Sequence, residues 1–128
     1  MSVDMTQFHA ELFEECLGYL DAMKTDLESI DLNAFDEEKM ATIKRGAHTI
    51  KGDCAMFEFT IVSDYAKIME VLLGQMLDKL KETNTANIEA MLESVAYVRT
   101  MITTLQDKGT LDDVAAAAHG ARLQEIIV

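Results

Sequence analysis

Apolar residues recur three and four positions apart along most of the chain, the spacing that places them on one face of an α-helix. This pattern predicts helices over residues 4–29, 36–57, 60–81 and 84–107, and a further helix from residue 110. No proline interrupts these stretches, and they are rich in Ala, Leu, Met, Glu and Lys, which favour helices. The pattern therefore predicts an all-α protein.

Each of the four long helices carries one apolar seam that we expect to face the interior. The predicted seams are Phe8, Leu12, Cys16, Tyr19, Met23, Leu27 and Ile30 in the first helix; Met40, Ile43, Ala47, Ile50, Cys54 and Phe57 in the second; Val62, Tyr65, Met69, Leu72, Met76 and Leu80 in the third; and Ile88, Met91, Val95, Val98, Ile102 and Leu105 in the fourth. Such alternation of three and four steps is typical of helical bundles.

Polar residues mark the predicted helix ends. Asp4 and Gln7 are spaced as a capping pair, Thr60 and Asn84 are the expected caps of the third and fourth helices, and Lys108-Gly109 is a stop signal. The connections are short, so consecutive helices should be antiparallel. We expect an up-down-up-down four-helix bundle in residues 1–108, and an additional C-terminal helix or the start of a linker in residues 109–128.

The composition limits the class and the location of the protein. The 128 residues, 49% of them apolar, suffice for one folded core. Cys16 and Cys54 occupy seam positions and should be free, buried thiols. The nine methionines suit core packing or, alternatively, a docking surface. Acidic residues stand where a signal peptide would be basic, and no apolar run could span a bilayer, so we expect a cytoplasmic protein without membrane insertion.

The formal net charge of −12 argues against nucleic acid as a partner, because phosphate backbones require a basic surface. The charge is unevenly distributed along the chain. The first 38 residues are strongly acidic, whereas positions 39–52 contain no acid and four basic residues, Lys39, Lys44, Arg45 and Lys51. This positive segment is either an ordinary solvated face or a surface for an anionic group.

His48 lies within this positive segment. At about 100° per residue, its side chain points roughly 135° away from the centre of the apolar seam, so it should lie on the exposed flank of the second helix. Lys44 and Lys51 share that flank, one turn on either side. Gly52 follows one turn after His48 at a cost of about 1 kcal/mol relative to alanine, which indicates that the imidazole is kept accessible to another protein.

This arrangement suits an imidazole that receives a phosphoryl group. A neutral imidazole is a nucleophile through one ring nitrogen, while the other nitrogen carries a hydrogen that a carboxylate can accept. Glu70 is the candidate carboxylate, because it interrupts an apolar run and points about 120° away from the seam of the third helix. Alternatively, Glu70 is a boundary residue that faces water. The ammonium groups of Lys44 and Lys51 can stabilise phosphoryl oxygens.

The segment Ala47-His48-Thr49-Ile50-Lys51-Gly52 resembles the signature of the histidine phosphotransfer (HPt) family. Phe57-Glu58-Phe59-Thr60 continues it as in the phosphotransfer domains of CheA-type chemotaxis histidine kinases, and the first helix is similar to the start of those domains. The resemblance covers roughly residues 4–107, and its central motif is more specific than the amphipathic remainder.

The resemblance implies that a separate ATP-binding histidine kinase domain phosphorylates His48. The phosphoryl group then passes to an aspartate on a response regulator receiver, CheY- or CheB-like. The resemblance also implies that Glu70, which follows His48 by 22 residues, hydrogen-bonds the imidazole, and that Lys51 assists the transfer.

Some positions differ from the family pattern and bear on the choice of partner. Lys67 stands where a second histidine is common, and Asp53, Ala55 and Glu58 stand where glycine or small residues are common. We assign Lys67, together with Lys44 and Gly52, to phosphoryl or partner binding.

The sequence contains no ATP-binding motif, and its three histidines show no metal-ligand spacing. We therefore expect no metal site and no cofactor in this chain; ATP and Mg²⁺ would belong to the kinase domain and the receiver. The chain is either the N-terminal piece of a larger kinase or a free-standing phosphotransfer protein. Two other classes remain open: a non-catalytic helical adaptor or dimerisation module, in which His48 is incidental, and a cofactor-binding bundle.

Overall fold

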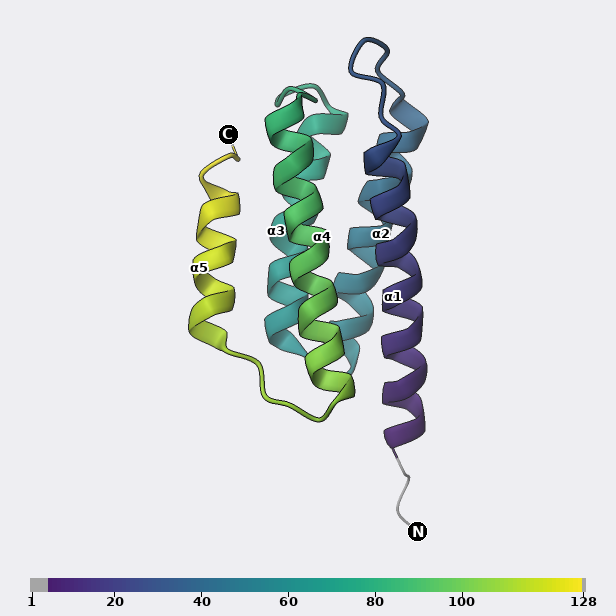
Figure 1. The fold of residues 1–128 in the computed structure, drawn as a ribbon, viewed down its shortest axis with the longest axis vertical. Helices are drawn as coiled ribbons and strands as arrows, with labels where there is room; N and C mark the ends of the chain where they lie inside the picture. Colours follow the sequence, from purple (N-terminus) through teal and green to yellow (C-terminus); the bar gives the residue numbers. More distant parts are fainter. Residues whose placement is uncertain (1–4, 128) are drawn as a thin grey trace.

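The computed structural model describes residues 5–127, and these residues form five α-helices and no strand. The helices are α1 (Thr6–Glu28), α2 (Glu37–Met56), α3 (Thr60–Leu77), α4 (Thr85–Gln106) and α5 (Asp113–Gln124). Helices α1 to α4 run alternately up and down the molecule, and α5 lies beside them (Figure 1). The predicted all-α fold, an up-down-up-down bundle with a fifth helix, is confirmed.

Four of the helices form a closed bundle. α2 and α3 make the most extensive contact of any two helices, and α1 packs against both α2 and α4. α3 also contacts α4, which completes the ring, while α5 packs on the outer side of α3 (Figure 1). The pair formed by α2 and α3 is therefore the most extensively packed part of the fold, and it contains His48, Lys51 and Glu70.

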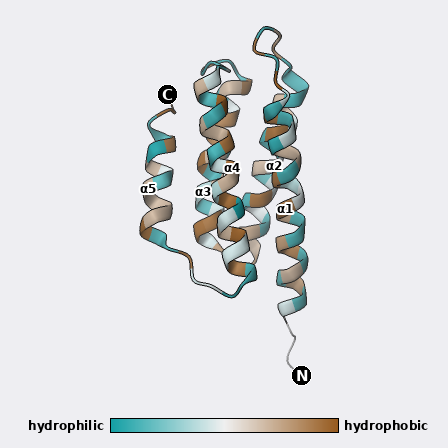
Figure 2. Ribbon diagram, in the orientation of Figure 1, coloured by the Kyte–Doolittle hydropathy of each residue, from teal (hydrophilic) through white to brown (hydrophobic). Residues whose placement is uncertain are grey.

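One apolar stripe from each helix fills the interior, and hydrophobic and hydrophilic residues alternate along the ribbons (Figure 2). Most predicted seam residues are buried, but two predictions are wrong: Phe8 is 47% exposed, and Leu80 is 67% exposed beyond the end of α3. Four further seam residues are partly buried and pack against the core: Tyr19, Ile30, Phe57 and Leu105. In α1, Phe13 and Leu20 are buried instead, because this helix packs between α2 and α4 and not against one neighbour.

Side-chain caps begin three of the helices. The carboxylates of Asp36 and Asp112 accept backbone N–H hydrogen bonds at the starts of α2 and α5, and the amide oxygen of Asn84 does so for α4. The predicted cap of α3 is wrong. Thr60 is the first residue of the helix, and Phe59 before it makes no capping side-chain hydrogen bond.

α3 ends earlier than predicted, at Leu77 and not near Lys81. The physical reason lies in the next turn, where Lys79 adopts the left-handed conformation with φ of 61°. The backbone N–H of Leu80 then donates to the carbonyl of Gln75 at 2.8 Å, which closes the helix end. A lysine in this conformation is uncommon, so the sequence carried no stop signal here.

The predicted stop at Lys108-Gly109 is confirmed, since α4 ends directly before it. The left-handed residue is Lys108, with φ of 61°, and the N–H of Gly109 donates to the carbonyl of Thr104 at 2.8 Å. The predicted cap by Asp4 lies outside the described residues, and α1 begins without a side-chain cap.

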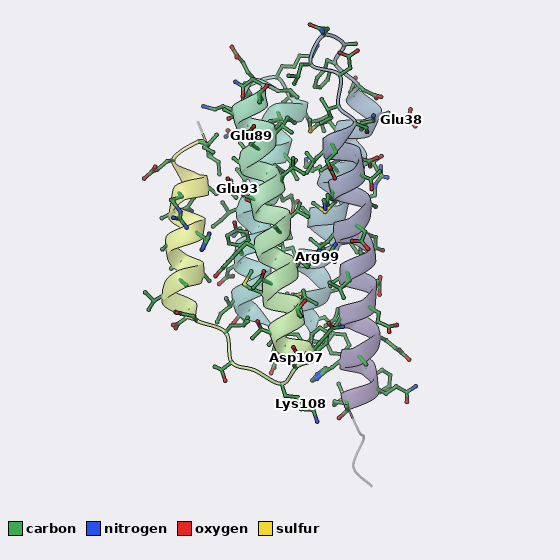
Figure 3. All side chains as sticks on the ribbon, viewed as in Figure 1. Glu38, Glu89, Glu93, Arg99, Asp107 and Lys108 are labelled. Atoms are coloured by element: carbon green, nitrogen blue, oxygen red, sulfur yellow. The ribbon has the colours of Figure 1, made fainter. Side chains whose placement is uncertain are left out.

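Side-chain contacts join α4 to α1 on one side of the bundle and α5 to α3 and α4 on the other. Arg99 of α4 lies on the side of α1, where it forms an ion pair with Asp21 (Figure 3). On the other side, α5 approaches α3 closely through small residues: Gly120 is buried, and a Cβ there would lie 3.0 Å from Cδ1 of Ile68. The ring of His119 stacks on Tyr97 with the centroids 3.9 Å apart. The division of the chain after residue 108 stays a prediction.

Candidate functional site

The imidazole of His48 lies on the exposed flank of α2, as the helical periodicity predicts. Its side chain is 63% exposed. Ala47 and Ile50, its neighbours on the same helix, are buried in the core, and they fix the direction in which the flank faces. The active site of another protein can therefore reach the ring without any change of fold.

The connection between α2 and α3 determines which residues of the two helices meet. Residues 57–59 turn the chain, so positions at similar distances before and after this turn lie near each other in the antiparallel pair. His48 precedes Phe59 by 11 residues, and Glu70 follows it by 11. Nδ1 of His48 and Oε1 of Glu70 are hydrogen-bonded at 2.9 Å. The predicted pair is therefore present in the structure.

Glu70 also contacts a lysine of α2. Nζ of Lys51 lies 2.8 Å from Oε2, the second carboxylate oxygen. The side chains of Lys51 and Glu70 are 29% and 18% exposed, so water screens this ion pair only in part. Glu70 thus holds two side chains of α2 at once, one through each oxygen.

These contacts fix the protonation of the pair. Partial burial acts to raise the pKa of Glu70, but the hydrogen bonds and charges of Lys51 and His48 outweigh it and lower the pKa below its ordinary value. The carboxyl group is ionised at neutral pH and can only accept hydrogen bonds. It follows that Nδ1 of His48 carries a hydrogen and donates it, so the neutral ring keeps its lone pair on Nε2.

A hydrogen bond that the sequence did not predict joins α2 and α3 at Lys51. The buried hydroxyl of Ser63, on α3, donates to the backbone carbonyl of Lys51 at 2.9 Å. This contact holds the backbone of α2 in register with α3 within one turn of His48. Its one trace in the sequence is a small polar residue next to the seam residue Val62.

Three lysines line a cleft of about 340 Å³ between α2 and α3, which we call the lysine cleft: Lys44, Lys51 and Lys67. The register of the hairpin again explains one contact. Lys44 precedes Phe59 by 15 residues and Gly74 follows it by 15, and Nζ of Lys44 lies 3.5 Å from where a Cβ of Gly74 would stand. The structure therefore brings Lys67 beside Lys44 and Lys51, and His48 lies outside the lining of this cleft.

Gly52 is exposed, and a methyl group on its Cα would meet nothing within 4 Å. Packing within the fold therefore does not require glycine at this position. Helix propensity disfavours it as well. That Gly52 keeps the imidazole accessible to another protein stays a prediction.

The other histidines lie elsewhere. His9 packs among aromatic rings, with centroids 5.1 Å from Phe59 and 5.7 Å from Phe57, and His119 stacks on Tyr97. Within residues 5–127 no three potential ligands come together as a metal site would require. In the same part of the chain, none of the helices combines the length and the apolarity that crossing a bilayer demands.

The chain belongs to the Hpt domain family, which residues 7–108 match. Among curated proteins it is similar to the chemotaxis protein CheA of Salmonella typhimurium, with 33% identity over 94 residues, which covers 73% of this chain and 14% of the relative. CheA of Borreliella burgdorferi is 25% identical over 104 residues, covering 80% of this chain and 12% of the relative. The chain thus spans about one seventh of the length of such relatives.

A solved structure shares the fold. The phosphorylated P1 domain of CheA3 from R. sphaeroides, determined in complex with CheY6, superposes with a TM-score of 0.83 at 20% sequence identity. The match covers 94% of this chain and 95% of that one, so it extends into α5. At this identity the likeness concerns the fold, and the residues around His48 must be judged on their own geometry.

The open surroundings of Gly52 yield a prediction with a matched control. Gly52→Ala should stabilise the protein by up to about 1 kcal/mol, because alanine favours the helix and its methyl group meets no atom. If the glycine serves access, the same change should slow phosphoryl transfer at His48. Gly18→Ala in α1, equally open, should stabilise the fold without slowing transfer. Urea unfolding and transfer rates measure both effects, and an unchanged transfer rate in Gly52→Ala would contradict the role in access.

The lowered pKa of Glu70 predicts a pH-dependent contribution to stability. This contribution is fully present above the unfolded-state pKa of about 4.3, and it is lost as the pH falls through the lower folded-state value. Glu70→Gln should therefore lower the free energy of unfolding near pH 7 and have a smaller effect near pH 3. Glu89→Gln, at an exposed position of α4 (Figure 3), should have little effect at either pH. A Glu70→Gln effect that did not vary with pH would be evidence against the charged network.

Proposed function

We propose that this chain is a phosphotransfer domain of two-component chemotaxis signalling. His48 accepts a phosphoryl group from the ATP-binding domain of a histidine kinase and passes it to an aspartate of a response regulator receiver. The observation that carries the proposal is the exposed imidazole whose Nδ1 is bonded to Glu70, in a chain of the Hpt domain family. A ring held in this way has one reactive nitrogen, and that nitrogen is open to a partner.

Phosphorylation begins at Nε2 of His48, whose lone pair attacks the γ-phosphorus of ATP. The N–P bond forms while the bond from phosphorus to the bridging oxygen breaks, and ADP leaves with that electron pair. The ring gains positive charge, which the carboxylate of Glu70 stabilises through the hydrogen on Nδ1. Lys51 keeps this carboxylate oriented through the ion pair at 2.8 Å.

The second step returns the ring to its starting state. A carboxylate oxygen of the receiver's aspartate attacks the phosphorus, the N–P bond breaks, and its electron pair goes back to Nε2. The leaving group is a neutral imidazole, because the hydrogen on Nδ1 stays in place throughout. The contact with Glu70 thus serves both directions of transfer without any net movement of protons.

Both steps need a second protein. We assign ATP and Mg²⁺ to the kinase domain and the receiver, since the sequence contains neither a P-loop nor a glycine-rich nucleotide loop. The CheA relatives, of which this chain spans about 14%, support a place in a larger CheA-type kinase. A CheY- or CheB-like receiver and a cytoplasmic location complete the proposal.

The proposal predicts a single phosphorylation site. His48→Gln should abolish the transfer of labelled phosphate from ATP by a CheA-type kinase core, while His9→Gln should accept the label normally. The side chain is exposed, so stability should change by no more than about 0.5 kcal/mol. The label on the wild-type chain should be acid-labile and base-stable. Label retained by His48→Gln would reject the proposed function.

Replacing Glu70 should slow the phosphorylation of His48 more than replacing Lys51. Glu70→Ala removes the acceptor of the Nδ1 hydrogen and should slow phosphorylation by about 10-fold to 100-fold. Lys51→Ala leaves that acceptor in place, so it should slow the reaction less. Single-turnover rates with a kinase core measure both, and Glu89→Ala provides the control for loss of a carboxylate. Wild-type rates in Glu70→Ala would remove Glu70 from the mechanism.

A further inference from the structure

The lysine cleft contains cations that the proposed chemistry does not use. Lys51 is engaged by Glu70 at 2.8 Å. Lys44 and Lys67 form no ion pair with any of the described residues, although both line the same cleft. The cleft is thus lined by three lysines and by the two carboxylates of Glu70 and Asp78, and it has an excess of positive charge in a chain whose formal net charge is −12.

The fold builds this cleft from both helices. Lys44 and Lys51 line it from α2, and Lys67 lines it from α3. Lys44 lies against Gly74, with its Nζ 3.5 Å from where a Cβ of Gly74 would stand, an ordinary van der Waals distance. Val71, 43% exposed, adds apolar surface to the lining.

The need for extra cations is greatest when the phosphorylated form meets the receiver. A phosphoryl group adds between one and two negative charges to His48 at neutral pH, and the receiver approaches with the carboxylate that will accept it. The acidic body of this chain repels such a surface at long range. The unphosphorylated form lacks the added charge, and the anionic triphosphate that it meets is held, in the proposed function, by the kinase domain with its Mg²⁺.

We propose that the lysine cleft is a docking surface for the carboxylate-bearing rim of the receiver, and that Lys44 and Lys67 determine association with the receiver. This inference rests on the proposed function. It assigns both lysines to partner binding, in place of the stabilisation of phosphoryl oxygens that the sequence allowed for Lys44, because His48 lies outside the lining of the cleft. Charges at the rim of an interface act chiefly on the association rate and on its dependence on salt.

The test compares two double variants. Lys44→Gln with Lys67→Gln removes the free cations of the cleft, and Lys24→Gln with Lys108→Gln removes two exposed cations elsewhere. Each pair of changes shifts the formal net charge from −12 to −14, since two positive charges are lost. The phosphorylated proteins are mixed with a CheY-type receiver that the wild-type chain phosphorylates, over a range of receiver and salt concentrations. Far-UV circular dichroism and urea unfolding establish that all variants are folded.

The cleft variant should lose about 10-fold in the second-order rate of transfer at low salt and much less at high salt. Its rate at saturating receiver and its phosphorylation by the kinase core should stay within about 2-fold of wild type, whereas the control variant should resemble wild type throughout. An equal loss in the control variant, a lower rate at saturating receiver, or a slower kinase step in place of a slower encounter would overturn the proposal. Transfer by the wild-type chain in the same experiment tests the proposed function separately.

Discussion

The hydrogen bond from Nδ1 of His48 to Glu70 is the contact on which the chemistry of this site depends. It joins α2 to α3 and leaves Nε2 as the one ring nitrogen with a free lone pair. A bond of this kind is useful only if the two helices keep their register. The core seams of α2 and α3 and the hydrogen bond from Ser63 to the backbone of Lys51 maintain that register, so the packing of the pair and its reactivity have the same origin.

The electrostatics of the site follow from the two contacts that Glu70 makes with α2. One oxygen accepts the imidazole hydrogen and the other meets Lys51, so the carboxylate is ionised and fixed although it is only 18% exposed. The imidazole itself is largely in solvent. The fold thus encloses the carboxylate and exposes the imidazole that it contacts, which is the arrangement that the proposed relay between two protein partners requires.

Much of this could be predicted from the sequence, because the relevant signals are periodic. The apolar seam of α2 places His48 on its flank, and the short turn at residues 57–59 places Glu70 opposite it. The cap of α4 by Asn84 followed from local chemistry as well. These inferences need only the periodicity or the end of one helix, or the connection between two consecutive helices.

Other features depended on the tertiary environment. Phe8 fits a helical seam, but α1 packs between two neighbours and buries Phe13 and Leu20 instead. The end of α3 is set by a left-handed lysine, Lys79, for which no local rule gives a signal. The position of Lys44 against Gly74 likewise needs three-dimensional contact information.

The most direct test of the account is to determine which ring nitrogen of His48 carries the phosphoryl group. Nitrogen-15-labelled chain, phosphorylated by a kinase core, would be examined by two-bond and three-bond proton–nitrogen correlation and by phosphorus–nitrogen coupling. The structure predicts a phosphorus-coupled Nε2 and a protonated Nδ1 that shifts when Glu70 is replaced by alanine. A phosphoryl group on Nδ1, the atom that contacts Glu70, would contradict the account.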